Sequence, residues 1–400
     1  MPITLFTPIT PITPITRRLT LTLAGAALLV VSLAAPAQPA GEPIKFINVG
    51  ELSGLGATTG TNWKAGVDLA AKEINATGGI LGRKLVVQAF DTQTNPGIAK
   101  AMIAKAAEEE PYMILGPGFS GSVLVAMTES RRSEIPNFTS AEATSITQQG
   151  NPYIFRTSFA QANSMPRVAR YIADNLKAKS VAVVYINSDF GKGGRDAILK
   201  ELQARGIKIA ADISTEPGQV DYSSAVVKAK QSRADVLFPY LTEEESARLL
   251  RELRKQNYGK PIVGETTILE QKVIELAGAA ANGVRAHVGL TTENNNPLMK
   301  AFAERFEKEY KYKPNHNATK GYIAMYTIKA VTEKVGKVDR KAFAQAMKNV
   351  RLSAKDYPGI LMDVAYDDKG DLDRESFLVE VKDGKQVVIE TLPPLNPVKK

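Results

Sequence analysis

Residues 114–122 read ILGPGFSGS and join a short apolar run to the beginning of a helical pattern. Gly116, Gly118 and Gly121 have the spacing G-x-G-x-x-G, which is typical of turns that bind a dinucleotide. A strand that passes through such a turn into a helix leaves the first N–H groups of the helix without carbonyl partners. The stretch therefore predicts an α/β fold with an anion-binding turn at the end of a strand.

The details of this turn favour a single carboxylate over a dinucleotide. A dinucleotide fingerprint opens the first strand–helix unit of its domain, whereas this turn follows the third apolar run. Pro117 removes one N–H group, and Phe119 adds bulk where a diphosphate would lie. Ser120 and Ser122 can donate hydroxyl hydrogen bonds beside the backbone. The alternatives are a Ser120 that serves only as a helix cap and, more remotely, an NAD(P)-dependent enzyme.

Apolar runs and amphipathic helical patterns alternate on both sides of the turn. Residues 44–50, 85–91 and 112–116 are apolar runs, and residues 62–76 and 96–110 between them have helical spacing. The same alternation begins again after residue 159. Continuous apolar strands between helices indicate parallel sheets that are covered on both faces. The sequence thus predicts two α/β units in series.

The composition excludes several classes of protein. The chain has no cysteine, which removes disulfides, thiol catalysis and Cys-ligated metals. It has only two histidines, His287 and His316, and no G-x-S-x-G, so neither a zinc site nor a serine hydrolase is expected. The formal net charge is +9 without a run of basic residues. We therefore expect no enzyme activity, metal, cofactor or nucleic-acid partner.

The first 37 residues have the pattern of a secretory signal peptide. Arg17 and Arg18 precede an apolar stretch that ends in the small-residue pattern Ala35-Pro36-Ala37, so cleavage is expected after Ala37. No later stretch of about 18 uninterrupted apolar residues could span a bilayer. We expect the mature chain to be exported to the periplasm.

Several segments resemble the solute-binding proteins of ABC importers, above all the leucine/isoleucine/valine-binding group. They lie in matching order along nearly the whole mature chain, at residues 51–96, 115–122, 135–144 (IPNFTSAEAT), 153–159 (YIFRTSF), 186–194 (INSDFGKGG), 215–238 and 366–372. The resemblance implies a type I periplasmic binding protein fold, in which two Rossmann-like lobes with parallel sheets are joined by three hinge crossings. It implies lobe 1 at residues 42–157 and 290–358, lobe 2 at 158–289 and 359–400, and crossings near 155–159, 287–292 and 357–362.

The resemblance also implies where a ligand carboxylate is held. The loop after the third strand matches Ser120, Gly121 and Ser122. The loop after the fourth strand matches Ala141, Glu142, Ala143 and Thr144, with Thr144 as the hydroxyl donor.

The other side of the ligand cleft leaves two ligand classes open. Phe190 matches an aromatic residue of the second lobe, and Thr59 stands where the first lobe often has one. If Glu265 faces the cleft, it can pair with a ligand ammonium. If Thr266 takes that place, an acid without an amine is expected, stacked between Trp63, Phe190 and Tyr240.

We therefore expect a periplasmic solute-binding component of an ABC transporter that captures a small carboxylate ligand by lobe closure. The lead ligand is a branched-chain or other hydrophobic amino acid, and the alternative is an aromatic or other amine-free carboxylic acid. The partner implied is an inner-membrane ABC permease, and we expect the binding protein to be a monomer.

Overall fold

The first part of the chain builds a five-stranded parallel sheet, called the first sheet. The computed structural model describes residues 41–395, and the predicted signal peptide lies outside the described residues. The strand order of the first sheet is β2-β1-β3-β4-β5, and all neighbours are parallel. Its strands are β1 (Ile44–Gly50), β2 (Leu85–Asp91), β3 (Met113–Leu115), β4 (Asn137–Thr139) and β5 (Ile154–Arg156).

The second sheet is built from two sets of strands. Three parallel strands have the order β7-β6-β8, and four more have the order β15-β14-β10-β9. A bridge between Leu237 and Ile262 joins the two sets, so that parallel strands continue from β7 to β10 and β14 and β15 follow in antiparallel pairing. The strands are β6 (Ser180–Ile186), β7 (Lys208–Thr215), β8 (Val236–Tyr240), β9 (Val263–Glu265), β10 (Arg285–Val288), β14 (Ser376–Lys382) and β15 (Lys385–Leu392).

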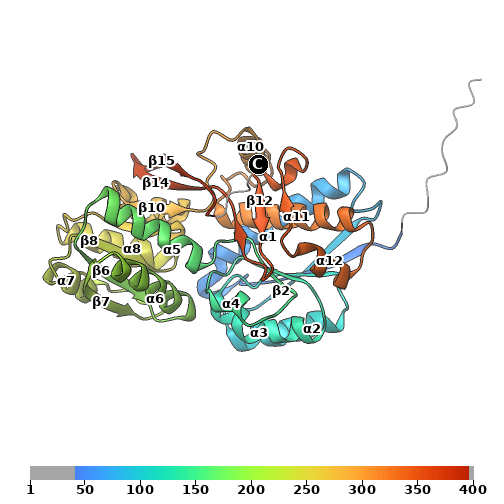
Figure 1. Ribbon diagram of the computed structural model, residues 1–400, viewed down its shortest axis with the longest axis horizontal. Helices are drawn as coiled ribbons and strands as arrows, with labels where there is room; N and C mark the ends of the chain where they lie inside the picture. Colours follow the sequence, from blue (N-terminus) through green and yellow to red (C-terminus); the bar gives the residue numbers. More distant parts are fainter. Residues whose placement is uncertain (1–40, 396–400) are drawn as a thin grey trace, which may run out of the picture. The chain divides into compact units, whose positions relative to one another are not determined.

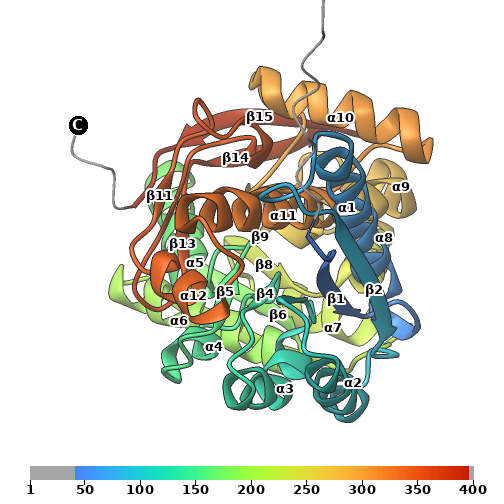
Figure 2. The same ribbon diagram turned by 90° about the vertical axis from the view of Figure 1, so that its right-hand side faces the viewer.

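Helices cover both faces of each sheet, as expected for apolar parallel strands. In Figure 2, α2 and α3 lie on one side of the first sheet, and α1 and α11 lie on the other. Apolar side chains of α5 and α6 pack on one face of the second sheet. The helices are α1 (Ala57–Ala76), α2 (Pro96–Glu108), α3 (Ser120–Arg132), α4 (Ser145–Gln148), α5 (Gln161–Arg170), α6 (Asp189–Ala204), α7 (Ser223–Gln231), α8 (Glu243–Lys255), α9 (Gln271–Ala277), α10 (Pro297–Tyr310), α11 (His316–Val335) and α12 (Arg340–Met347), with short helical turns η1 (Gly54–Gly56), η2 (Tyr171–Asn175), η3 (Thr266–Leu269), η4 (Gly278–Ala281) and η5 (Pro358–Ile360).

The chain passes between the two sheets three times. It leaves the first sheet after β5 and returns after β10, because α11 packs along α1 (Figure 1). The small antiparallel sheet of β11 (Arg351–Leu352), β12 (Val364–Tyr366) and β13 (Leu372–Asp373) also lies at the first sheet, where the amide of Arg156 donates to the carbonyl of Gly370. The third passage therefore follows β13. The sequence places it near residues 357–362, but this segment contains η5, which packs on α11.

The predicted fold class, an α/β protein with parallel sheets joined by crossings, is confirmed. Alternation of apolar strands and amphipathic helices was sufficient to predict it. The antiparallel strands β14 and β15 complete the second sheet from the end of the chain.

The contact between α1 and α11 depends on two glycines and gives a first prediction. A Cβ atom at Gly66 would overlap the carbonyl oxygen of Ala318, and one at Gly321 would overlap that of Trp63. Gly66→Ala should therefore lower the free energy of unfolding in urea by about 1–3 kcal/mol or more, because it overpacks a rigid contact. Gly259→Ala is the matched control, since a Cβ there meets no atom within 4 Å. Equal stability of the two variants would contradict this account of the helix contact.

Candidate ligand-binding site

A cavity of about 280 Å³ lies where the two sheets meet, and residues of both line it. From the first sheet it receives the turn after β3, the loop after β4 and the beginning of α1. From the second it receives the end of β6, the first turn of α6, and the residues at the start of α8, which follows β8. Its position at the carboxyl ends of parallel strands is where open α/β sheets bind their ligands.

Local capping explains why several helices begin at this cavity. The Ser188 side chain accepts a hydrogen bond from the amide of Gly191 at the start of α6, and Thr242 and Glu245 form a capping box at the start of α8. Asn315 caps α11 by accepting from the amide of Ala318. By contrast, the N-cap residue of α3, Phe119, provides no side-chain cap.

The turn after β3 is capped instead by a carboxylate of the protein itself. Glu51 is fully buried and accepts from the amides of Gly118 (2.9 Å) and Phe119 (3.1 Å). Burial raises the pKa of Glu51, while these hydrogen bonds lower it. The anion-binding turn that the sequence predicts thus already holds an acid group. The amides of Gly118 and Phe119 are therefore already hydrogen-bonded within the protein. The predicted residues Ser120, Gly121 and Ser122 line the cavity beside them.

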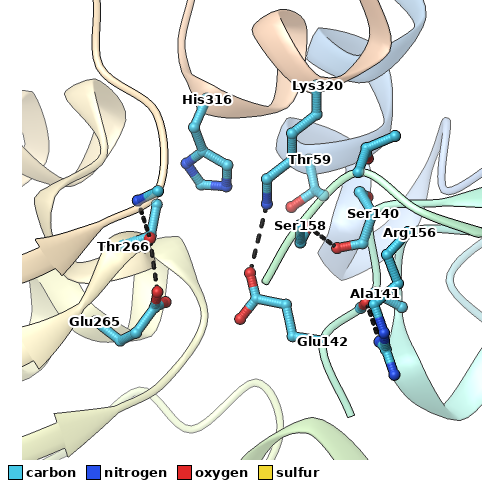
Figure 3. A network of polar contacts seen from close by, with 12 residues as sticks. Thr59, Ser140, Ala141, Glu142, Arg156, Ser158, Glu265, Thr266, His316 and Lys320 are labelled. Carbon is cyan, nitrogen blue, oxygen red and sulfur yellow. Dashed lines mark hydrogen bonds and ion pairs between the residues drawn. The ribbon is translucent and has the colours of Figure 1, made fainter. Parts of the chain in front are cut away.

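The loop after β4 places one carboxylate at the centre of the site. The predicted residues Ala141 and Glu142 line the cavity. Glu142 accepts a hydrogen bond from the Tyr240 hydroxyl (3.1 Å), and its other oxygen lies 3.4 Å from the Lys320 ammonium (Figure 3). Burial and the nearby carboxylate of Glu265 together raise the pKa of Glu142 to about 7, although Lys320 opposes both effects.

Two predicted residues of this loop lie outside the cavity. Ala143 donates its amide to the Ser120 hydroxyl (3.1 Å), and the Thr144 hydroxyl accepts from the amide of Ala162 (3.0 Å). Both line a neighbouring hollow between α3 and α6. Thr144 therefore links the loop to α5.

The second sheet contributes an aromatic pair and an acid. Phe190 lines the cavity and stacks on Tyr240, with ring centres 4.2 Å apart. Tyr240 lies behind it, fully buried. Glu243, the first residue of α8, also lines the cavity, and its carboxylate accepts from the hydroxyl of Thr59 (2.8 Å), a predicted site residue of α1. Burial raises the pKa of Glu243.

Glu265 and Thr266 lie behind the cavity, and neither lines it. A carboxylate oxygen of Glu265 accepts from the Thr266 hydroxyl (2.8 Å) and lies 3.2 Å from Nδ1 of His287. Burial lowers the pKa of His287 to about 3 and raises that of Glu265 to about 7. The cavity therefore receives neither Glu265, the expected partner of a ligand ammonium, nor Thr266, whose place there would have indicated an acid without an amine.

Trp63 belongs to the core. Its indole N–H donates to the Asn48 side chain (2.8 Å), and the ring is 3% exposed. Trp63 does not line the cavity, and its backbone carbonyl lies against Gly321 of α11.

Sequence reasoning missed Lys320, Glu243 and His316, which all line the cavity. Lys320 stands alone as a charge in a helix segment whose other residues are small, apolar or uncharged, and all residues from 316 to 325 are buried. A single charge in an otherwise uncharged helix segment was the feature of the sequence that could have indicated a functional role for Lys320. No such signal marked Glu243. It belongs to the run Glu243-Glu244-Glu245, and acidic residues are common in the exposed first turn of a helix.

Two features, a metal-binding cluster and a membrane-spanning helix, are not found in the described part of the chain. Residues 41–395 contain no group of three or more His, Asp or Glu side chains that could hold a metal ion. They also include no helix with the length and hydrophobicity needed to cross a bilayer.

The paired sheets and the cavity between them define a solute-binding protein. The chain belongs to the periplasmic binding protein family, whose sequence profile matches residues 43–386. It is 29% identical to the Leu/Ile/Val-binding protein BraC3 of Rhizobium johnstonii, over 91% of this chain and 98% of the relative. It is 26% identical to the leucine-, isoleucine-, valine-, threonine- and alanine-binding protein of Pseudomonas aeruginosa, over 88% of this chain and 93% of the relative.

Solved structures agree on the fold. The leucine-binding protein LivK of Thermotoga maritima has a TM-score of 0.80 at 21% identity, covering 88% of this chain and 99% of the other. A solute-binding protein of R. palustris, solved in complex with benzoate, has a TM-score of 0.81 at 22% identity, covering 89% and 98%. Family membership confirms the predicted class of binding protein and is evidence against the NAD(P)-dependent enzyme.

Proposed function

We propose that this protein is the solute-binding component of an ABC importer and that it captures a small hydrophobic amino acid. The observation that carries the proposal is the pair of opposite charges in one buried cavity. Lys320 and the first turn of α3 can receive the ligand carboxylate. Glu243, whose carboxylate accepts from the neutral hydroxyl of Thr59, can receive the ammonium.

The apolar side of the cavity supports a hydrophobic ligand. Leu55, Phe119, Ile186 and Phe190 line it beside the charged groups. The volume of about 280 Å³ suits a ligand smaller than the drug-sized molecules that occupy cavities of roughly 300–1,000 Å³. The named relatives that bind leucine, isoleucine and valine agree with this ligand class.

Closure of two lobes provides the mechanism. Thr59 and Glu142 from one side of the cavity bond to Glu243 and Tyr240 from the other, so the described arrangement corresponds to a closed site. A ligand that contacts both sides stabilises this state by binding it better than an open one. We propose lobe 1 at residues 42–157 and 290–358, and lobe 2 at residues 158–289 and 359–400. The last boundary moves to about residue 373, because β13 lies at the first sheet.

An amine-free aromatic acid is the second candidate. Phe190 and Phe119 could enclose an aromatic ring while Lys320 pairs with its carboxylate. The benzoate complex of the R. palustris protein shows a similar fold with such a ligand.

A binding panel tests the proposal and separates the candidates. Protein stripped of ligand by unfolding and refolding is titrated by calorimetry with leucine, phenylalanine, benzoate, 4-hydroxybenzoate and NAD⁺. We expect saturable binding of at least one amino acid and no heat from NAD⁺. Binding of benzoates alone would replace the lead ligand with the second candidate, and no binding of any acid would refute both.

The cellular setting follows from the same proposal. Residues 1–37 would direct export, the periplasm would be the place of capture, and an inner-membrane ABC permease would receive the loaded protein. We propose that the protein acts as a monomer, which size-exclusion chromatography with light scattering would test.

A further inference from the structure

Arg156, the last residue of β5, bonds to the loop that carries Glu142. Its side chain is fully buried. One terminal nitrogen of the guanidinium donates to the carbonyl of Ala141 (2.7 Å), and the other donates to the carbonyl of Ala143 (2.6 Å). Figure 3 shows Arg156 beneath this loop, on the side away from Lys320. The planar guanidinium can hold two carbonyls at once because its donors form a fixed fork.

The two carbonyls belong to the residues directly before and after Glu142. Both carbonyls point towards Arg156. The Glu142 side chain points towards Lys320 and Tyr240 instead. The carbonyl of Glu142 accepts from the amide of Gln161 (3.0 Å), which fixes the loop at a third point. The direction of the central carboxylate is therefore set by main-chain contacts as well as by its own ion pair.

Asp371 holds Arg156 from the opposite side. It lies in the turn between β12 and β13, and its carboxylate accepts from Nε of Arg156 and from the hydroxyl of Thr147 (2.9 Å). The neighbouring Gly370 accepts from the Arg156 amide (3.0 Å). Gly370 has a φ of +91°, and a Cβ there would overlap the carbonyl oxygen of Ile154. The turn can therefore approach β5 closely only with glycine at this position.

We propose that Arg156 and Asp371 are positioning residues, which hold the loop of residues 141–144 so that Ala141 and Glu142 face the cavity. This inference rests on the proposed function of the cavity. It assigns a role in binding to a turn more than 200 residues away in the sequence, next to the last passage between the sheets.

Arg156→Lys tests the proposal, with Arg254→Lys as the matched control. Lysine keeps the positive charge beside Asp371 but cannot hold two carbonyls as a fork. Arg254 likewise bonds to the carbonyls of Ala280, Tyr258 and Asn282, but these lie in and around α8 and η4, away from the cavity. Arg156→Lys should weaken affinity for the panel's best ligand by at least about tenfold, as expected when hydrogen bonds to a charged group are lost. Arg254→Lys should leave the affinity within about twofold of the wild type, even if both variants melt at lower temperature.

Hydrogen exchange provides a readout that needs no ligand. The amides of Ala141 and Ala143 donate to the hydroxyls of Thr139 and Ser120. Arg156→Lys and Asp371→Asn should both speed exchange at residues 141–144 relative to Arg254→Lys, because the loop opens more readily. Failure of the wild type to bind any acid would refute the proposed function alone, and the exchange data would still decide whether Arg156 fixes the loop.

The proposal is overturned by a folded Arg156→Lys variant with wild-type affinity and wild-type exchange. If Arg156→Lys does not fold, Asp371→Asn decides in the same way, since it keeps the shape of the side chain and removes its charge. An equal loss of affinity in Arg254→Lys would also overturn it, because the effect would then follow from general destabilisation.

Discussion

Lys320→Met should lower the free energy of unfolding by about 3–5 kcal/mol at pH 8, the cost typical of removing one partner of a buried ion pair. Lys320 forms an ion pair with Glu142, and both side chains are nearly inaccessible to solvent. Burial lowers the pKa of Lys320, while Glu142 and Glu265 raise it. Without Lys320, the two carboxylates would have to ionise beside each other in the interior. Urea denaturation measures the loss.

The effect of Lys320→Met should depend on pH in a defined direction. The pKa of Glu142 in the folded protein, about 7, lies above its usual value of 4.5. A carboxyl with a raised pKa stabilises the fold below its usual value and loses that contribution as the pH rises through the raised one. Loss of Lys320 raises the pKa of Glu142 further, so the variant should lose more stability than the wild type between pH 5 and pH 8.

Glu142→Gln in the same chain provides the control. The double variant Lys320→Met/Glu142→Gln contains neither charge of the pair, so it should recover a large part of the lost stability at pH 8. If the loss of stability in the double variant equals the sum of the losses in the two single variants, Lys320 and Glu142 are not coupled. A small loss for Lys320→Met at every pH would show that the ammonium is not buried against Glu142.

Glu243→Gln should weaken binding of an amino acid by about ten- to a hundredfold, as expected for a lost charge-assisted hydrogen bond of about 1.5–3 kcal/mol. The amide oxygen of glutamine can still accept from Thr59, so the contact between α1 and α8 is kept while the charge facing the cavity is removed. Binding of benzoate, which has no ammonium, should be unchanged or stronger. Calorimetric titration of both ligands separates these outcomes.

Glu244→Gln is the matched control for this substitution. Glu244 is the next residue of α8, and its carboxylate accepts from the hydroxyl of Thr58 (2.9 Å), but it does not line the cavity. Its replacement should change amino-acid affinity by less than about threefold, because Glu244 lies outside the cavity and the amide oxygen of glutamine can still accept from Thr58. Equal losses in the two variants would remove Glu243 from the site, and strong amino-acid binding by Glu243→Gln would point to another partner for the ammonium.

The fold could be predicted because strand and helix periods are local features of the sequence. The first five strands lie in the sheet with the turn at Gly116 at its carboxyl end, as the alternation indicated. The third passage between the sheets could not be placed from the same pattern. Its position depends on β12 and β13, two very short strands whose pairing brings Gly370 to β5.

The sequence predicted the site residues that come soon after a strand. It missed the residues that reach the cavity through packing of distant parts of the chain. Ser120, Glu142 and Phe190 follow strands directly, and all three line the cavity. Lys320 reaches the cavity only because α11 returns from the end of the chain to pack along α1. The orientation of Glu265 towards His287 likewise depends on the pairing of β9 with β10, which no local pattern reveals.

Glu51 has a consequence for the shape of any acid that this protein can accept. Its carboxylate occupies the anion-binding position formed by the amides of Gly118 and Phe119, so a ligand acid group has to bind elsewhere in the cavity. A shorter, neutral side chain at position 51 would leave these two amides free to bind another anion. Such a variant is a starting point for a receptor that binds dicarboxylates, in which these main-chain amides hold the second carboxylate of the ligand.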